Sequence, residues 1–131
     1  FLIKPNRQEL ADLFGVTIKT DDETVFYARK LQEEGAENVL ISMGGDGAIL
    51  IDNDQNAYKL PAFSGKLKNS VGAGDSMVAG FLAGYEKSKN IEYAFRLASA
   101  AGSATAFHDD LATKEQIEEL YSSHIQVIRR I

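Results

Sequence analysis

The sequence contains no cysteine, which excludes a disulfide framework and a zinc site with thiolate ligands. It has no apolar run near the roughly 18 residues that a membrane-spanning helix needs, and no pattern typical of a signal peptide. Its 14 Lys and Arg are outnumbered by 19 Asp and Glu, for a formal net charge of −5. This balance argues against a surface for nucleic acid or anionic membranes, since both need clustered basic residues. We therefore expect a cytoplasmic protein with neither kind of partner.

The composition that remains is typical of one globular domain. The chain has 131 residues, of which 44% are apolar, and this is enough to bury a core without metals or disulfides. It shows no internal repeat, linker or low-complexity tract. It starts at Phe1 without a methionine, and "FLIKPN" has the pattern of a buried strand that runs into a turn. We expect a further segment to precede these residues in the complete protein.

Strand and helix patterns alternate along the chain. Residues 1–4 predict a strand that Pro5 ends, and Asn6 is a good N-cap for a helix over 7–14 that Gly15 stops. The later expected elements are a helix capped by Asp21 or Asp22 and ending near Gly35, a buried strand over 38–43, its hairpin partner over 48–53, a strand over 57–63, helices over 73–87, 91–107 and 113–123, and a closing strand over 125–131. Alternation of this kind predicts an α/β layered domain.

The stretch "NSVGAGDSMVAGF" over 69–81 sets glycines directly before a predicted helix. It matches neither common nucleotide fingerprint, because no Lys follows the glycines and Met77 stands where G-x-G-x-x-G needs its third glycine. A loop that enters a helix nevertheless leaves several backbone amides unpaired at the helix start. Together with the helix dipole, the amides around Gly72 and Gly74 predict a pocket for a phosphate or a developing oxyanion.

Asp75 stands directly beside this predicted anion pocket. A carboxylate there repels an anionic ligand, so its presence suggests a chemical role. In phosphoryl transfer a fixed Asp accepts the proton of the attacking hydroxyl while amides hold the phosphoryl group. The alternative is that Asp75 only interacts favourably with the helix dipole. Local physics leaves both interpretations open.

The segment "VGAGDSMVAGF" resembles the signature of the ribokinase-like (PfkB) carbohydrate kinases, whose G-A-G-D segment supplies an anion hole and a catalytic Asp. The resemblance covers essentially this whole chain but only the C-terminal half or so of a family member. It implies a three-layer α/β/α, Rossmann-like sheet, with residues 1–131 as the nucleotide-binding and catalytic part and with the N-terminal part and the lid absent. It also implies that Asp75 is the base and that Gly72, Ala73 and Gly74 form the anion hole.

Two further segments resemble family motifs in the expected order. "KPNRQE" is similar to an N-x-x-E element, which implies that Asn6 and Glu9 lie near Mg²⁺ and the phosphates, although the pair also fits a plain capping box. "SMGGDG" is similar to an S-x-G-x-x-G nucleotide loop, although it also fits a simple hairpin turn. The implied nucleotide contacts are Ser42, Met43, Gly44, Gly45, Asp46, Gly47, Gly74 and, in a helix that by resemblance lines the adenine pocket, Ser103.

Within the family, this sequence looks most like bacterial 1-phosphofructokinases and tagatose-6-phosphate kinases. That resemblance implies ATP and Mg²⁺ as cofactors and a phosphorylated ketohexose as acceptor, with fructose 1-phosphate ahead of tagatose 6-phosphate. In such enzymes the sugar is held mainly by the N-terminal half and the lid, and the lid commonly forms a homodimer. We therefore expect the isolated chain to lack kinase activity. A catalytically silent nucleotide-binding fragment and a non-enzymatic interaction domain are the alternatives.

Overall fold

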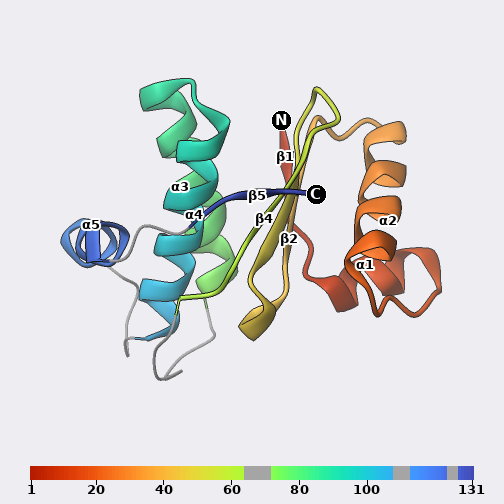
Figure 1. The fold of residues 1–131 in the computed structure, drawn as a ribbon, viewed down its shortest axis with the longest axis horizontal. Helices are drawn as coiled ribbons and strands as arrows, with labels where there is room; N and C mark the ends of the chain where they lie inside the picture. Colours follow the sequence, from red (N-terminus) through yellow and green to blue (C-terminus); the bar gives the residue numbers. More distant parts are fainter. Residues whose placement is uncertain (64–71, 108–112, 124–126) are drawn as a thin grey trace. The chain divides into compact units, whose positions relative to one another are not determined.

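Five strands and five α-helices make up the described residues, 1–63, 72–107, 113–123 and 127–131, of this computed structural model (Figure 1). Their order is β1 (Leu2–Ile3), α1 (Arg7–Phe14), α2 (Asp21–Glu33), β2 (Asn38–Ser42), β3 (Ala48–Ile51), β4 (Ala57–Leu60), α3 (Ala73–Ser88), α4 (Ile91–Ala106), α5 (Lys114–Ser123) and β5 (Arg129–Arg130). A 3₁₀ turn, η1 (Gly44–Asp46), links β2 to β3. Each expected element is present, although every strand is shorter within the described residues than predicted. In this described part, no helix is long and apolar enough to cross a membrane.

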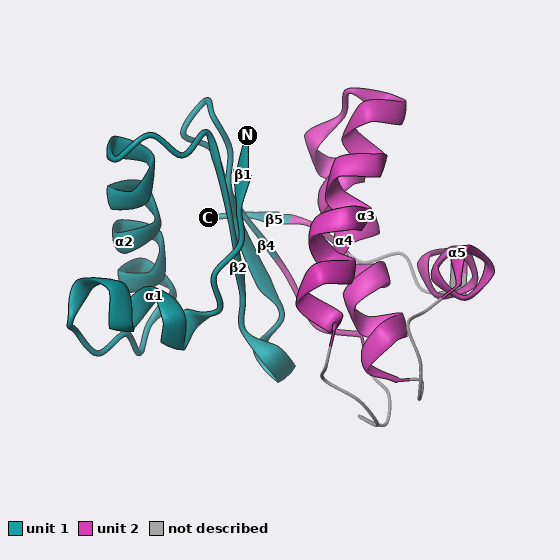
Figure 2. Cartoon of the chain, turned by 180° about the vertical axis from the view of Figure 1, so that it is seen from behind, with its two compact units in different colours: residues 1–59, 129–131 teal, residues 60–128 magenta. Residues whose placement is uncertain are grey.

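The chain divides into two compact units, residues 1–59 with 129–131 and residues 60–128 (Figure 2). The first unit contains the sheet, whose strands lie side by side in sequence order from β1 to β5. β1 runs parallel to β2, whereas β2 with β3 and β4 with β5 form antiparallel pairs. Parallel neighbours need a long crossover between them, and here α1 and α2 supply it.

The core of the first unit lies between the sheet and its two helices. Its buried members are Leu10, Ala11, Ile18, Ala28, Leu31, Val39, Ile41, Ile49, Ile51 and Ala57. Each large aliphatic side chain in such a core contributes about 1.5–3 kcal/mol relative to an exposed one. Leu40 and Leu50 alternate with these residues along β2 and β3, and both are also fully buried. The prediction that the strand over 38–43 is buried is therefore confirmed for Asn38 to Ile41.

Both helices of the first unit begin with a capping box. Asn6 is the N-cap of α1, as predicted, and Gly15 ends that helix in the left-handed conformation, at φ 63°. The N-cap of α2 is Thr20, so the prediction that Asp21 or Asp22 caps this helix is wrong. The Thr20 hydroxyl accepts a hydrogen bond from the Glu23 amide at 3.1 Å, and the Glu23 carboxylate accepts one from the Thr20 amide. The Asp21 carboxylate is therefore available to bind the side chains of Arg7 and Lys59.

In the second unit, α3 and α4 pack closely through small residues. A Cβ built on Gly80 would lie 2.9 Å from the Cβ of Ala101, and one built on Gly84 would lie 3.1 Å from the Cα of Ala94. Both glycines therefore set the separation of the two helices. α5 contacts α4 through Tyr93 and Tyr121, whose ring centroids lie 5.7 Å apart in an edge-to-face arrangement.

Three charged side chains connect α1, α2 and β4. Arg7 Nη2 donates to Asp21 Oδ1 at 3.0 Å, and Lys59 Nζ donates to Asp21 Oδ2 at 2.6 Å. All three side chains are partly buried, with exposed fractions of 20% for Arg7, 23% for Lys59 and 32% for Asp21. The hydrogen bond from Lys59 and the charges of both cations lower the pKa of Asp21 below its usual value. The ionised carboxylate therefore stabilises the fold.

We predict that Asp21→Asn destabilises the chain at neutral pH and has a smaller effect in acid. A carboxylate whose pKa is lowered by folding stabilises the native state above its ordinary pKa of about 3.9. That stabilisation disappears as the pH falls through the lower, folded-state pKa. Thermal unfolding followed by circular dichroism between about pH 7 and about pH 3 should show the melting temperatures of parent and variant converging.

The matched control is Asp22→Asn, because Asp22 is the next residue of the same helix and is exposed. It shares the interaction with the helix dipole but not the contacts with Arg7 and Lys59. The difference in melting temperature between Asp22→Asn and the parent should depend less on pH. If the difference in melting temperature between Asp21→Asn and the parent is the same at both ends of the pH range, the ionised Asp21 carboxylate does not stabilise the fold as we assign.

Candidate functional site

Two of the predicted motifs meet at one edge of the sheet in the first unit. Asn6 follows β1 and Ser42 ends β2, and the two residues form an isolated parallel bridge. The Ser42 amide also donates to the carbonyl oxygen of Pro5 at 3.2 Å. The N-x-x-E segment and the S-x-G-x-x-G loop therefore lie side by side, although more than thirty residues separate them in the sequence.

The loop after β2 is a tight turn whose glycines have structural reasons. The Met43 amide donates to the Gly47 carbonyl at 2.9 Å, and the Gly47 amide donates to the Gly44 carbonyl at 3.1 Å. Gly44 and Gly47 have φ values of 56° and 91°, which residues with a Cβ rarely adopt. A Cβ on Gly44 or Gly45 would meet nothing within 4 Å, so the backbone on this side is open to a ligand. The predicted hairpin turn is confirmed, and the predicted nucleotide contact is compatible with it.

Asp46 belongs to this same turn, where its side chain is exposed. It occupies the last position of η1, and its amide donates to the Met43 carbonyl at 3.0 Å. Its position is that of a turn residue, as expected for the Asp-Gly pair.

Asn6 and Glu9 form a complete capping box at the start of α1. The Glu9 amide donates to Asn6 Oδ1 at 2.7 Å, and the Asn6 amide donates to Glu9 Oε1 at 2.9 Å. The plain capping interpretation is therefore confirmed. Glu9 is exposed and a carboxylate accepts several hydrogen bonds or ligands, so capping leaves its second oxygen for another interaction.

A hydrated Mg²⁺ fits this donor set better than a fully enclosed cation. The described residues contain no group of three or more His, Cys, Asp or Glu side chains that could hold a metal ion. Mg²⁺ commonly keeps several waters and binds through one or two carboxylates and the substrate phosphates. The exposed carboxylate of Glu9 and the amide oxygen of Asn6, beside a loop with open backbone, are compatible with that mode.

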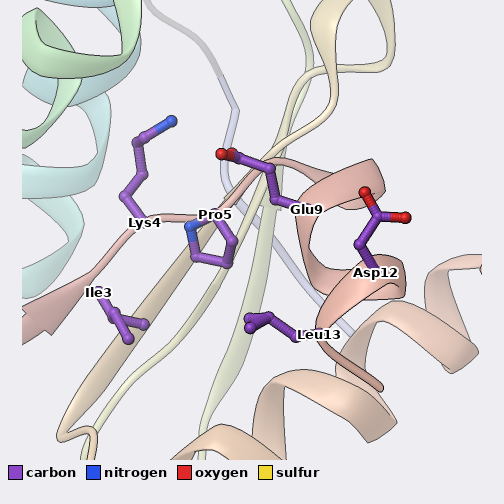
Figure 3. A pocket seen from close by; sticks show the side chains of 6 residues that line it. All are labelled: Ile3, Lys4, Pro5, Glu9, Asp12 and Leu13. Atoms are coloured by element: carbon purple, nitrogen blue, oxygen red, sulfur yellow. The ribbon is translucent and has the colours of Figure 1, made fainter. Parts of the chain in front are cut away.

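An open hollow of about 510 Å³ lies beside the start of α1 (Figure 3). It is lined by Ile3, Lys4, Pro5, Glu9, Asp12 and Leu13. Figure 3 shows the Glu9 carboxylate and the Lys4 side chain extending from the same side of the hollow, whereas Asp12 lies further along the helix. The hollow includes one predicted metal-binding residue and no residue of the loop over 42–47.

The first turn of α3 carries the remaining motif in the second unit. The described part of this motif begins at Gly72, the N-cap, which has a left-handed conformation with φ 82°. Glycine has no side chain that could accept from the amides of the first turn, so the N-cap residue leaves them for another acceptor. Asp75 is exposed at the third helical position. The turn can therefore present backbone amides and one carboxylate to the same ligand, as the sequence predicts.

Ser103 lies in α4, in the same unit, and is partly buried. Its carbonyl accepts a hydrogen bond from the Phe107 amide at 3.0 Å, close to the end of the helix. The preceding residue, Gly102, faces Ala73 and Met77 of α3. Ser103 is thus near the end of α4 that packs on the first turn of α3, and its contact with adenine stays a prediction.

Several polar residues near these segments escaped the sequence analysis. They are the ion cluster of Arg7, Asp21 and Lys59, and the hydroxyl pair of Ser76 and Thr105, whose oxygens lie 2.8 Å apart. Arg7 directly follows Asn6, and Ser76 directly follows Asp75, so adjacency to a predicted site residue was the available signal. Their partners lie far away in the sequence and gave no signal.

Known proteins that resemble this chain are carbohydrate kinases. A model of the family described as pfkB family carbohydrate kinase matches residues 1–117. The chain is 52% identical over 120 residues to a 1-phosphofructokinase of Bacillus subtilis. The matched region covers 92% of this chain and 39% of that protein. The chain is 41% identical over 128 residues to a D-tagatose-1-phosphate kinase of Bacillus licheniformis, covering 97% of this chain and 41% of that protein.

A solved structure supports the same assignment. The crystal structure of a candidate phosphofructokinase from Staphylococcus aureus superimposes with a TM-score of 0.90 and 44% identity, covering 99% of this chain and 42% of that one. The chain spans about two fifths of the length of the curated relatives named above. The match to the family model includes all three predicted motifs, and the predicted ribokinase-like α/β fold is confirmed. The chain belongs to the pfkB family of carbohydrate kinases.

Proposed function

We propose that residues 1–131 form the C-terminal, nucleotide-binding and catalytic part of an ATP-dependent sugar-phosphate kinase. The acceptor that we favour is fructose 1-phosphate, which would become fructose 1,6-bisphosphate. The first turn of α3 carries this proposal, because a glycine N-cap in the left-handed conformation and an exposed Asp75 combine an anion site with a base. The 52% identity to a 1-phosphofructokinase supports the choice of acceptor.

In this mechanism the amides of Gly72, Ala73 and Gly74 hold the γ-phosphoryl group of ATP as charge develops on its oxygens. A hydroxyl oxygen of the sugar phosphate forms a bond to the γ-phosphorus, and the bond from that phosphorus to the bridging oxygen of ADP breaks. Asp75 accepts the hydroxyl proton. In a loose transition state the proton leaves late, so the position of the carboxylate matters more than its basicity.

Further residues would bind the rest of the nucleotide. The open backbone of the loop over 42–47 would contact the phosphates and ribose, and Ser103 of the second unit would contact the adenine. The Glu9 carboxylate and the Asn6 amide oxygen would hold Mg²⁺. The cation would neutralise charge on the phosphates.

Two alternatives follow from specific observations. The 41% identity to a D-tagatose-1-phosphate kinase makes a tagatose phosphate the second candidate acceptor, and tagatose 6-phosphate stays a prediction. The chain also spans only about two fifths of its relatives, so in isolation it would be a nucleotide-binding part without a positioned acceptor. Proximity supplies about 7–11 kcal/mol of many catalysed barriers, so such a part would show at most slow ATP hydrolysis. The homodimer implied by the family resemblance would form through the lid of the complete enzyme.

A calorimetric titration of this chain with a non-hydrolysable ATP analogue, with and without Mg²⁺, tests the nucleotide-binding role. Saturable binding that Mg²⁺ strengthens would support it. If a folded chain does not bind, the same titration with the complete gene product decides, and absence of binding there would contradict the role. Turnover of the complete gene product with fructose 1-phosphate and with each tagatose phosphate then identifies the acceptor.

We predict that Asp75→Asn in the complete gene product lowers kcat by about 10²- to 10⁴-fold, the usual contribution of a general base. The KM for ATP should change little, because the amides that hold the phosphates are backbone groups. Steady-state kinetics measures both constants. Glu86→Gln is the matched control, because Glu86 is an exposed carboxylate of the same helix, three turns away. Normal turnover of Asp75→Asn would exclude the catalytic role.

We predict that Glu9→Gln weakens the Mg²⁺ dependence of nucleotide binding while leaving the helix cap intact. A glutamine oxygen still accepts from the Asn6 amide, whereas the negative charge that attracts the cation is lost. The Mg²⁺ concentration for half-maximal strengthening of analogue binding should rise roughly 10-fold, the lower end of the effects seen around metal sites. Calorimetry at several Mg²⁺ concentrations gives this value, and circular dichroism gives the melting temperature.

Glu23→Gln provides the control for this experiment. Glu23 occupies the same position of the second capping box, at the start of α2, with Thr20 as its partner. Only Glu9→Gln should change the Mg²⁺ dependence. Glu23→Gln should lower the melting temperature at least as much, because the Glu23 carboxylate also accepts from the Lys19 amide and the Thr20 hydroxyl. If Glu9→Gln leaves the Mg²⁺ dependence unchanged, Glu9 caps α1 but does not bind Mg²⁺.

A further inference from the structure

The first turn of α3 is intrinsically a weak helix start. Gly72 is its N-cap and Gly74 is its second helical residue, and glycine has a high conformational entropy to lose. An N-cap without a side chain also gives no hydrogen bond to the first-turn amides. A turn that must hold amides and a carboxylate in place therefore needs support from outside its own sequence.

α4 contacts this turn at very short range. A Cβ built on Gly102 would lie 3.3 Å from the carbonyl oxygen of Ala73 and 3.5 Å from the Cβ of Met77. Glycine at this position lets the backbone of α4 approach the backbone of the first turn of α3. Met77 is itself buried, so the turn has little room to shift away from α4.

A pair of hydroxyl groups connects the two helices at the same level. Ser76 Oγ and Thr105 Oγ1 lie 2.8 Å apart, and Thr105 has no exposed surface. Ser76 directly follows Asp75, and its amide donates to the Gly72 carbonyl at 2.9 Å. The residue that closes the first turn on the N-cap is thus held to α4 by its side chain.

The rest of the α3–α4 interface also fixes the position of α3 relative to α4. Gly80 and Gly84 also bring the two helices close together further along α3. A Cβ built on Gly80 would lie 2.9 Å from the Cβ of Ala101, and one built on Gly84 would lie 3.1 Å from the Cα of Ala94. Helix α3 is therefore fixed against α4 over several turns. A hydroxyl contact at its first turn then sets the direction in which the turn points.

We propose that Thr105 is a positioning residue for the G-A-G-D turn. Its hydroxyl, with the close approach that Gly102 permits, holds Ser76 and through it the Asp75 carboxylate and the neighbouring amides. This role rests on the proposed function, because the turn matters for catalysis only if it binds the transferred phosphoryl group. Thr105 touches no substrate in this proposal, and it acts on the turn through its contact with Ser76.

The decisive variant is Thr105→Val in the complete gene product, because valine keeps the shape of threonine and removes the hydroxyl. A displacement of about 1 Å at a reacting group can cost on the order of 100-fold in rate. We expect kcat to fall roughly 10- to 100-fold, with the KM for ATP changed by less than about 2-fold. Thr105→Ser, which keeps the hydroxyl, should restore most of the turnover.

Ser76→Ala should lower kcat as Thr105→Val does, and the double variant should be no slower than either one, because all three lose the same contact. Thr24→Val is the matched control. Thr24 is equally buried, in α2, and its hydroxyl donates to the Thr20 carbonyl at 2.8 Å. That variant should lower the melting temperature while kcat per folded molecule stays normal.

Hydrogen exchange of the backbone amides over residues 74–77 supplies a readout that does not depend on kinase activity. Thr105→Val should speed this exchange while exchange in the rest of α3 stays as in the parent. Normal kcat in Thr105→Val, or failure of Thr105→Ser to restore activity, would overturn the proposal. If the parent phosphorylates no sugar phosphate, the proposed function fails, and unchanged exchange over 74–77 would separately overturn the positioning role.

Discussion

Parallel hydrogen bonding between β1 and β2 determines where the first unit can bind a ligand. Strands that run in the same direction end at the same edge of a sheet. Here Asn6, which follows β1, pairs with Ser42, the last residue of β2. The capping box of α1 and the glycine-rich loop both start from this edge. Ligands of open α/β sheets bind outside the carboxyl ends of parallel strands, and the predicted metal and nucleotide residues of the first unit have that position.

The second unit presents amides to a ligand in a different way. At the start of α3 the chain uses glycine, which exposes backbone and allows close approach but weakens the helix locally. The neighbouring helix restores order, because Gly102 and Thr105 of α4 contact the same turn. Local flexibility in the sequence is thus compatible with a fixed geometry in the folded chain. The supporting residues lie on a helix, which is a more rigid platform than a loop.

The capping box of α1 shows how one pair of residues can have two roles. Asn6 and Glu9 satisfy the helix terminus through one oxygen each, and the exposed carboxylate keeps a second oxygen. The same spacing in α2, between Thr20 and Glu23, forms an equivalent cap on a helix that follows another helix and not a strand. A capping box therefore says nothing by itself about metal binding. Its position at the edge of the parallel strands is what makes the first one a candidate.

Features that depend on near neighbours in the chain were predictable. The Asn6 cap, the Gly15 stop, the buried run of β2 and the turn over 44–47 follow from interactions that span a few residues, so their residue types are informative. The N-cap of α2 was not predictable with certainty, because Thr20, Asp21 and Asp22 can all accept hydrogen bonds from a helix start.

Tertiary structure decided among these residues. Asp21 binds Arg7 and Lys59, which lie 14 and 38 positions away, and this leaves the cap to Thr20. Ser76 meets Thr105 across 29 positions. The local pattern of the chain therefore specified which backbone groups begin each helix and that a glycine-rich turn precedes an Asp. Which side chains hold those groups in place depended on contacts that exist only once helices and strands have packed, because a contact between distant residues leaves no periodic trace in one sequence.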